Sequence, residues 1–189
     1  MHVTGYNQKK AFTIIEAIVV MALLVIISVG GASLMFYFIQ NSVFMPTQMN
    51  VDMIVSDALD ILIEGEGKIG GLRFSREITL AQPNEIIFVD QDGQKIRYYL
   101  YGLPSKLYRG FDIGHSIELI PYYVPTGVTL GPRGKALFTY YDANDNITMN
   151  PALVRRIAIG LVAQTGSGSY ENWDGHSEQV TSITVKKFQ

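Results

Sequence analysis

The sequence predicts an α+β fold in which one long N-terminal helix packs on a C-terminal antiparallel β-sheet. Two observations carry this prediction. Residues 12–39 form an apolar run, and an amphipathic helical pattern follows it over residues 40–64. Residues 65–189 instead contain short runs rich in Ile, Val, Phe and Tyr, separated by Gly, Asn and Asp. A helix that precedes a group of strands is the element order of an α+β domain, with the sheet covering one side of the helix.

The apolar run contains a single ionisable side chain, that of Glu16. As a helix at roughly 1.5 Å per residue the run would be about 42 Å long, and about 20 apolar residues suffice to span a bilayer. A charge inside a spanning helix costs about 2.5 to 3.5 kcal/mol and normally marks a function and a partner. Gly30 and Gly31 are equally consistent with close helix packing and with a flexible point.

Two lysines, Lys9 and Lys10, precede the run, and the next basic residue is Lys68. The positive-inside rule then places the N-terminus in the cytoplasm and the residues after about Ile39 outside the inner membrane. A secretory signal peptide has an apolar core of about 7 to 15 residues with a cleavage site after it. Because this run is much longer, we expect it to remain on the mature protein.

The start of the run and its flank resemble the class III signal of type IV pilins and of the pseudopilins of type II secretion systems. The resemblance implies that prepilin peptidase removes residues 1–11 as a basic leader by cutting between Ala11 and Phe12. Phe12 would then be the N-methylated first residue and Glu16 the fifth, as in the family. The family usually has Gly before the cut, but Ala11 is small enough to be tolerated.

The same resemblance implies a role for Glu16. Its carboxylate would pair with the new amino group of Phe12, either in a neighbouring subunit or in its own chain. The alternative is a carboxylate that only snorkels to the headgroups. Prepilin peptidase, other pilin or pseudopilin subunits, the inner-membrane assembly platform and the lipid bilayer are the implied partners, with a secreted substrate as a further one.

Composition argues against several other functions. The chain of 189 residues has a net charge of −2 and no cysteine, which excludes disulfides and thiolate metal sites. An acidic chain is not typical of a nucleic-acid-binding protein. A local basic patch of Arg155, Arg156, Lys186 and Lys187 keeps DNA binding open as an alternative. No nucleophile motif, phosphate loop or histidine cluster is visible, so we expect neither catalysis nor a cofactor or metal.

The amphipathic part contains Pro46, which is expected to kink or interrupt the helix because it lacks a backbone donor. Apolar residues then recur at helical spacing, and this stripe is expected to pack in the core of the same chain. Glycines from Gly65 onward are expected to end the helix. The predicted stripe consists of Val51, Ile54, Val55, Ala58, Leu59 and Leu62.

Several segments of the C-terminal part are predicted strands. Residues 85–89 and 95–101 flank an Asp-Gly step, which is a strong hairpin signal. Residues 155–163 alternate bulky and small side chains, and we expect the small face to lie under a closely packed helix. The other predicted strands are residues 116–123, 136–141 and 180–187.

Three loops invite a functional reading. Residues 90–93 and 142–146 carry oxygens at alternate positions, as calcium loops do, but neither has the complete pattern, and turn chemistry explains both. Residues 165–169 have the composition of a flexible linker. Trp173 is expected to pack on the protein's own sheet, with an interface anchor as the alternative.

Residues 138–144, 154–157 and 180–185 give a weaker resemblance to minor subunits of the J or W type. Together these patterns indicate a noncatalytic minor pilin or pseudopilin subunit that is incorporated near the tip of a type II secretion pseudopilus or a type IV pilus. The alternative function is a membrane-tethered extracytoplasmic protein that binds a ligand or DNA. A third is a bitopic enzyme with a pilin-like anchor.

Overall fold

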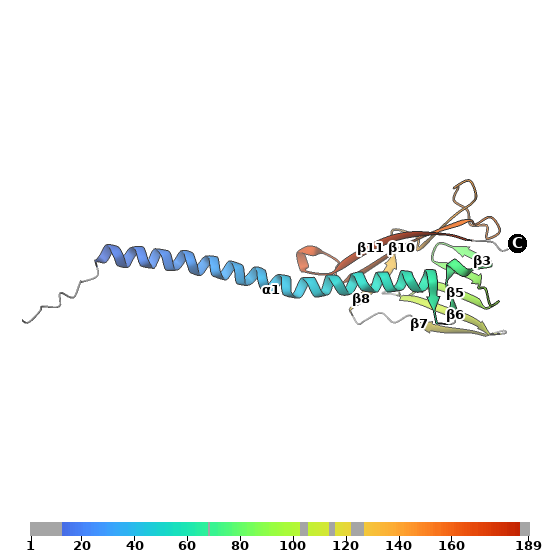
Figure 1. Ribbon diagram of the computed structural model, residues 1–189, viewed down its shortest axis with the longest axis horizontal. Coiled ribbons are helices and arrows are strands. Elements are labelled where there is room, and N and C mark those ends of the chain that lie inside the picture. The colour runs from blue at the N-terminus through green and yellow to red at the C-terminus, as the bar shows by residue number, and fades with distance from the viewer. Residues whose placement is uncertain (1–12, 68, 103–105, 114–115, 122–126, 186–189) are drawn as a thin grey trace, which may run out of the picture. The chain divides into compact units, whose positions relative to one another are not determined.

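The computed structural model describes residues 13–67, 69–102, 106–113, 116–121 and 127–185 (Figure 1). The chain divides into two units, residues 1–43 and 44–189, which we describe separately. One helix, α1 (Ile14–Glu64), supplies the described part of the first unit except Thr13, and it also begins the second unit. All other elements belong to the second unit.

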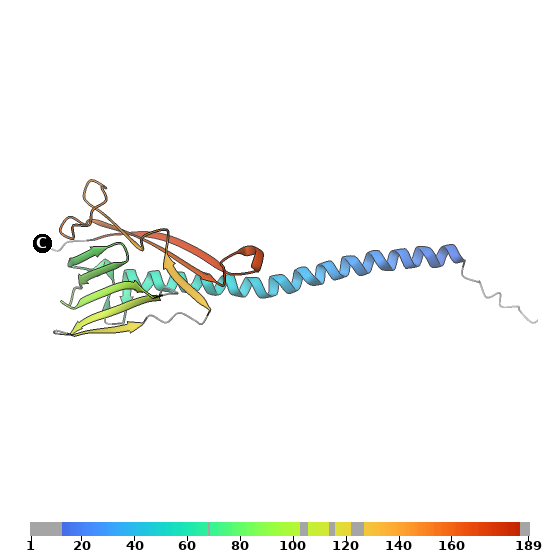
Figure 2. The same ribbon diagram turned by 180° about the vertical axis from the view of Figure 1, so that it is seen from behind.

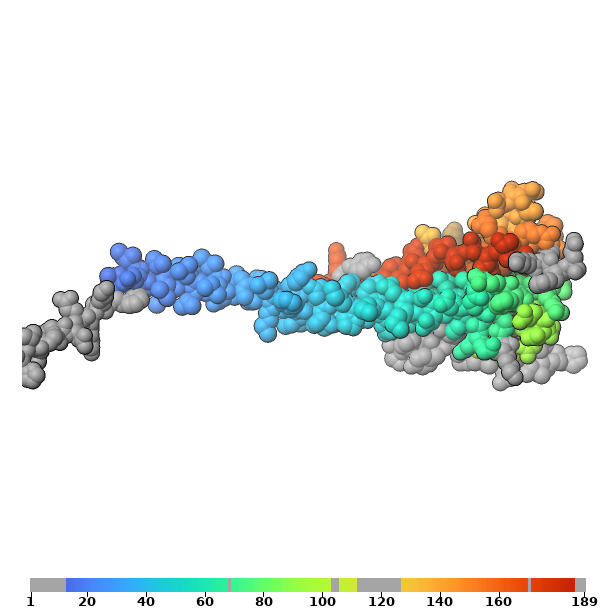
Figure 3. All heavy atoms as spheres, in the orientation of Figure 1, coloured from blue at the N-terminus to red at the C-terminus, as the bar shows by residue number. Residues whose placement is uncertain are grey.

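In the first unit the side chains of residues 18–39 are all exposed (Figure 3). No face of this part of α1 is polar, so none of its sides is suited to water. Among the described residues, α1 is the one helix that is long and apolar enough to cross a membrane, judged by length and composition.

In the second unit α1 continues through Pro46, so of the two expected outcomes, a kink or an interruption, the interruption is wrong. Proline removes the one hydrogen bond that its backbone nitrogen would donate to the carbonyl of Ser42. The hydroxyl of Ser42 donates to the carbonyl of Ile39 at 2.8 Å in the preceding turn. A single missing bond in a long helix does not end it, and α1 ends at Glu64, where the glycines begin.

The apolar stripe of this second part is confirmed as core. Its six predicted members are all buried, and Ile63 joins them. The aspartates between them, Asp52, Asp57 and Asp60, are exposed. The stripe therefore separates a buried side of α1 from a polar side.

One face of the core is a five-stranded antiparallel sheet with the strand order β3-β4-β5-β6-β7. The predicted hairpin of residues 85–89 and 95–101 is confirmed as β4 and β5, and its register pairs Glu85 with Tyr99. Strands β3 and β6 were not among the predicted elements. The strands are β3 (Glu77–Gln82), β4 (Glu85–Val89), β5 (Lys95–Tyr101), β6 (Lys106–Ile113) and β7 (Ser116–Pro121).

A second sheet is built around β10, which pairs with β11 along one edge and with β8 and β9 along the other. Figure 2 shows β10 and β11 as two long adjacent strands. A two-stranded ribbon, β1 (Gly65–Glu66) with β2 (Ile69–Gly70), and two short 3-10 helices, η1 (Leu72–Phe74) and η2 (Tyr170–Asn172), complete the fold. The strands of the second sheet are β8 (Val128–Pro132), β9 (Phe138–Tyr141), β10 (Arg156–Thr165) and β11 (His176–Thr184).

The faces of β10 are opposite to the expected ones. Its bulky residues, among them Ile157, Ile159 and Leu161, are buried, whereas the small alternate residues are partly exposed. A Cβ added to Gly160 would lie 2.9 Å from the Cβ of Arg133, so a side chain rather than a helix covers this face. Burying the larger apolar area gains more free energy, which turns the bulky face to the core.

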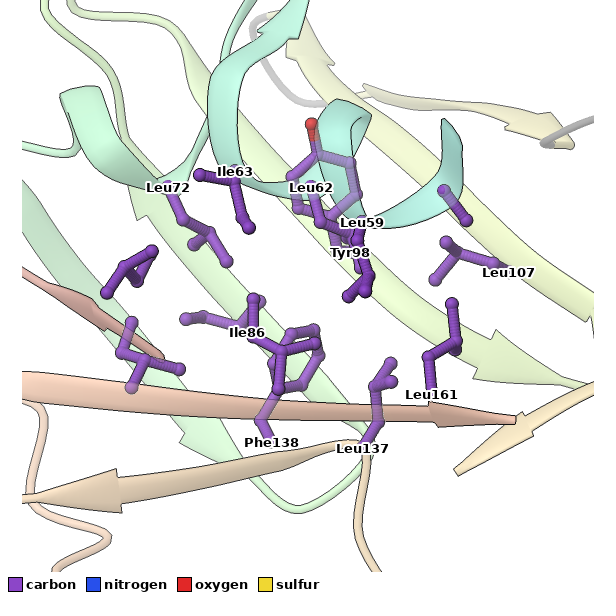
Figure 4. Packing of buried hydrophobic residues seen from close by; sticks show 14 of the residues in the cluster. Leu59, Leu62, Ile63, Leu72, Ile86, Tyr98, Leu107, Leu137, Phe138 and Leu161 are labelled. Atoms are coloured by element: carbon purple, nitrogen blue, oxygen red, sulfur yellow. The ribbon is translucent and has the colours of Figure 1, made fainter. Parts of the chain in front are cut away.

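The core lies where α1 and the two sheets meet. Figure 4 shows Leu59 and Leu62 of α1 together with Tyr98 of β5 and Leu161 of β10. The hydroxyl of Tyr140 on β9 is close enough to two carbonyl oxygens near the β3-β4 turn to donate a hydrogen bond to either. These are the carbonyls of Gln82 at 2.9 Å and Glu85 at 3.1 Å. This contact joins the two sheets.

Candidate functional site

The start of α1 is organised by Thr13 and Glu16. The backbone nitrogen of Thr13 donates to Oε2 of Glu16 at 3.0 Å, and the Thr13 hydroxyl donates to the same oxygen at 3.1 Å. In return the backbone nitrogen of Glu16 donates to the Thr13 hydroxyl oxygen at 3.2 Å. Because α1 begins at Ile14, Thr13 is the N-cap and Glu16 the third helical residue, so the two form a reciprocal capping box.

This arrangement gives the carboxylate two kinds of stabilisation. Thr13 and Glu16 accept bonds from each other's backbone N–H groups, which the first turn of any helix leaves without an intrahelical partner. The carboxylate also lies at the positive end of the helix dipole. The two bonds that the Glu16 carboxylate accepts both end on Oε2, and a carboxylate has about four lone-pair sites. Glu16 can therefore hold its capping position and still accept a bond from an ammonium group.

The other predicted site residues, Lys9, Lys10, Ala11 and Phe12, lie outside the described residues. The structure consequently brings Glu16 together with Thr13, a residue that the apolar pattern does not single out. The signal that identifies Thr13 is the Thr-x-x-Glu spacing directly before an apolar run, which is the sequence signature of a capping box.

The two acidic loops form turns. Oδ1 of Asp90 accepts from the backbone nitrogens of Asp92 and Gln94 at 2.9 and 2.8 Å. Asp142 repeats this pattern, and the backbone N–H groups of Asn146 and Asn144 hold the pKa of its carboxyl below the usual value. Within the described ranges, no group of three His, Asp or Glu side chains is arranged to hold a metal ion.

The proposed basic patch is only partly within the described residues, since Lys186 and Lys187 lie outside them. Arg156 forms an ion pair with Asp145 at 2.9 Å, and its guanidinium carbon lies 3.9 Å from the centroid of the Tyr141 ring. Arg155 is exposed. The charge of Arg156 is thus partly compensated, which weakens the case for a DNA-binding patch.

A hollow of about 780 Å³ lies on the outer side of β5, next to the β3-β4 turn. The rings of Tyr99 and Tyr108 stack in it at 5.4 Å between centroids. Arg97 lies over Tyr99 at 4.2 Å and forms an ion pair with Glu85 at 2.7 Å. This mixture of aromatic and polar groups is the feature on which a ligand-binding function would rely.

Comparison with known families gives a match at the N-terminus. Residues 6–32 match the family model described as the prokaryotic N-terminal methylation motif. The matched range includes the two lysines, the expected cleavage position and Glu16. No curated protein and no solved structure matches the chain.

This motif is the class III signal, which implies processing by prepilin peptidase and assembly with other pilin subunits. The architecture described above, in which the second part of one long N-terminal helix packs against antiparallel sheets, is pilin-like. The chain thus carries the class III signal of the type IV pilin and pseudopilin family on a pilin-like α+β fold.

Proposed function

We propose that this protein is a noncatalytic minor pilin or pseudopilin. Prepilin peptidase removes residues 1–11, Phe12 is N-methylated, and residues 12–39 hold the subunit in the inner membrane with its C-terminal domain outside. From there the inner-membrane assembly platform inserts it near the tip of a type II secretion pseudopilus or a type IV pilus, where it supports assembly and protein secretion.

The observation that supports this proposal best is the position of Glu16. The residue lies in the first turn of an apolar helix and within the methylation motif. In a bilayer its charge needs a partner, and the cleavage of a leader before Phe12 would create an amino group four residues away. One cut therefore produces both a mature subunit and a counter-charge.

The proposal is tested by coexpressing the full chain with prepilin peptidase and measuring the intact mass. We expect the product to begin at N-methylated Phe12. Ala11→Gly should be cut as well, whereas Ala11→Phe should block cleavage because a bulky side chain fills the protease subsite. A chain that keeps residues 1–11 beside an active peptidase, in cells that process another pilin normally, would contradict the proposal.

A further inference from the structure

The loop between β10 and β11 carries the chain's only tryptophan in an unusual conformation. Trp173 has a φ of 61°, in the left-handed region that bulky residues rarely adopt. Its side chain is 41% exposed. Non-glycine residues with such backbone angles persist where the surrounding structure holds them, and they concentrate at functional positions.

The loop itself is held by hydrogen bonds, contrary to the flexible linker expected for residues 165–169. The carboxylate oxygen Oδ2 of Asp174 accepts from the backbone nitrogen of Ser167 at 2.8 Å and from its hydroxyl at 2.7 Å. Across the loop, Thr165 and Gly175 exchange two bonds, one from each backbone nitrogen, at 2.9 and 2.7 Å. These hydrogen bonds thus order the loop that carries Trp173.

The β10-β11 loop and the start of β11 also contact α1. The side-chain amide of Gln48 donates to the carbonyl of His176 at 2.8 Å and accepts from its backbone nitrogen at 3.1 Å. Gly175 approaches α1 so closely that an added Cβ would lie 2.8 Å from Cγ2 of Val51. The Trp173 ring meets the ring of Phe44 edge to face, with 5.9 Å between the ring centroids.

Phe44, which Trp173 contacts, lies close in the sequence to the end of the apolar run. It follows Ile39, the last residue of the apolar run, by five residues, or about 8 Å at roughly 1.5 Å per residue. The headgroup region on each side of a bilayer is about 5 to 8 Å thick. The exposed aromatic residues Tyr37 and Phe38 lie at the end of the run, where aromatic side chains mark a membrane interface.

The length of the apolar run bears on the tilt of α1 in a bilayer. The part of α1 from Ile14 to Ile39 is about 39 Å long at roughly 1.5 Å per residue. This length exceeds the hydrocarbon thickness of about 30 Å, and a helix accommodates the excess by tilting. Interfacial Trp and Tyr side chains help to decide the direction of the tilt. A tilt brings one side of the segment that follows closer to the bilayer.

We propose that the β10-β11 loop is an interfacial membrane contact, in which Trp173 lies among the lipid headgroups and helps to set the tilt of α1 before assembly. The inference rests on the proposed function, because it requires residues 12–39 to span the membrane. The loop also exposes Glu171, so the contact depends on the amphipathic indole ring rather than on attraction to anionic lipids.

Because Trp173 is the only tryptophan, its emission reports on this contact directly. The full chain is placed in phosphatidylcholine vesicles, and quenching by shallowly brominated phosphatidylcholine is compared with quenching by aqueous iodide. We expect emission at shorter wavelength than for the urea-unfolded chain, strong quenching by the brominated lipid and little by iodide. As a control, Trp173→Phe combined with Phe74→Trp moves the reporter to η1, where iodide should quench and the brominated lipid should not.

Two further variants test the support of the loop. Gln48→Ala should raise iodide quenching of Trp173 and lower quenching by the brominated lipid, whereas Gln91→Ala, in the exposed β4-β5 turn, should change neither.

Iodide-accessible Trp173 in the wild-type chain would overturn the inference. Protection from both quenchers that increases with protein density in the vesicles would also overturn it, because a second copy would then cover the loop. Cleavage by prepilin peptidase is scored separately, so a cleaved chain with water-exposed Trp173 refutes this inference and leaves the proposed function standing.

Discussion

The two parts of α1 differ in whether their apolar side chains are exposed or buried. From residue 18 to residue 39 every side chain is exposed, whereas the part within the second unit buries seven residues and turns its aspartates to solvent. The second part therefore finds its apolar partner in its own chain. Among the residues that the structure describes, the first part has no such partner, and a helix that is apolar on all sides requires lipid or other helices. One continuous helix thus combines a segment that is apolar on all sides with an amphipathic segment of a folded domain.

The largest expected effect comes from truncating matched leucines in the two parts. Leu62 is fully buried, so Leu62→Ala should lower the free energy of unfolding by about 2 to 5 kcal/mol. Leu24 is 56% exposed, and Leu24→Ala should leave the stability of the domain unchanged. Urea unfolding of the full chain in detergent, followed by near-UV circular dichroism, measures both. Equal losses in the two variants would show that the two parts are not independent.

A second effect concerns alkaline pH and belongs to the domain alone. Burial raises the pKa of Tyr98 to about 12, and it also raises the pKa of Tyr140. An unfolded phenol titrates near pH 10, so the unfolded state releases its protons first. The free energy of unfolding should be insensitive to these phenols below about pH 10 and should then fall by about 1.4 kcal/mol per pH unit for each of them.

The variant Tyr98→Phe should remove one phenol's share of this slope between pH 10 and 12, as measured by urea unfolding at each pH. The same variant at pH 8 provides the reference, because both phenols are protonated there in the folded and the unfolded state. An unchanged alkaline slope in the variant would show that Tyr98 is not responsible for the loss.

The smallest expected change in stability lies at the start of the first part, where capping and charge can be separated. Thr13→Ala removes the N-cap and should cost about 1 kcal/mol of local helix stability, while the Glu16 charge remains. Glu16→Gln keeps a hydrogen-bond acceptor but removes the charge. If the charge pairs with a neighbouring amino group, Glu16→Gln should reduce crosslinking to neighbouring filament subunits much more than Thr13→Ala does.

Peptidase cleavage and membrane insertion serve as controls and should be normal in both variants. Crosslinking of Glu16→Gln at the wild-type level would favour a carboxylate that only snorkels to the headgroups. An equal loss in both variants would instead assign the effect to the capping box.

Local patterns were sufficient for the elements that need no distant partner. The stripe from Val51 to Leu62 follows from the helical period, and the β4-β5 hairpin follows from an Asp-Gly step between two apolar runs. The Thr13 to Glu16 spacing is likewise a local signal. Such features depend on backbone geometry over a few residues, and the sequence displays them directly.

The tertiary structure decided which surfaces meet. The alternation in β10 was visible, but only packing against α1 and the other sheet determined that its bulky face is buried. Strands β3, β6 and β8 form through pairing with their neighbours in space, and Trp173 contacts Phe44, which is 129 residues away in the sequence. By itself, the sequence determined the apolar run with its single charge and the amphipathic stripe, because both follow from local sequence patterns. The division into two sheets and the position of the β10-β11 loop against α1 required the folded chain, because contacts between distant segments are chosen by the total area that they bury together.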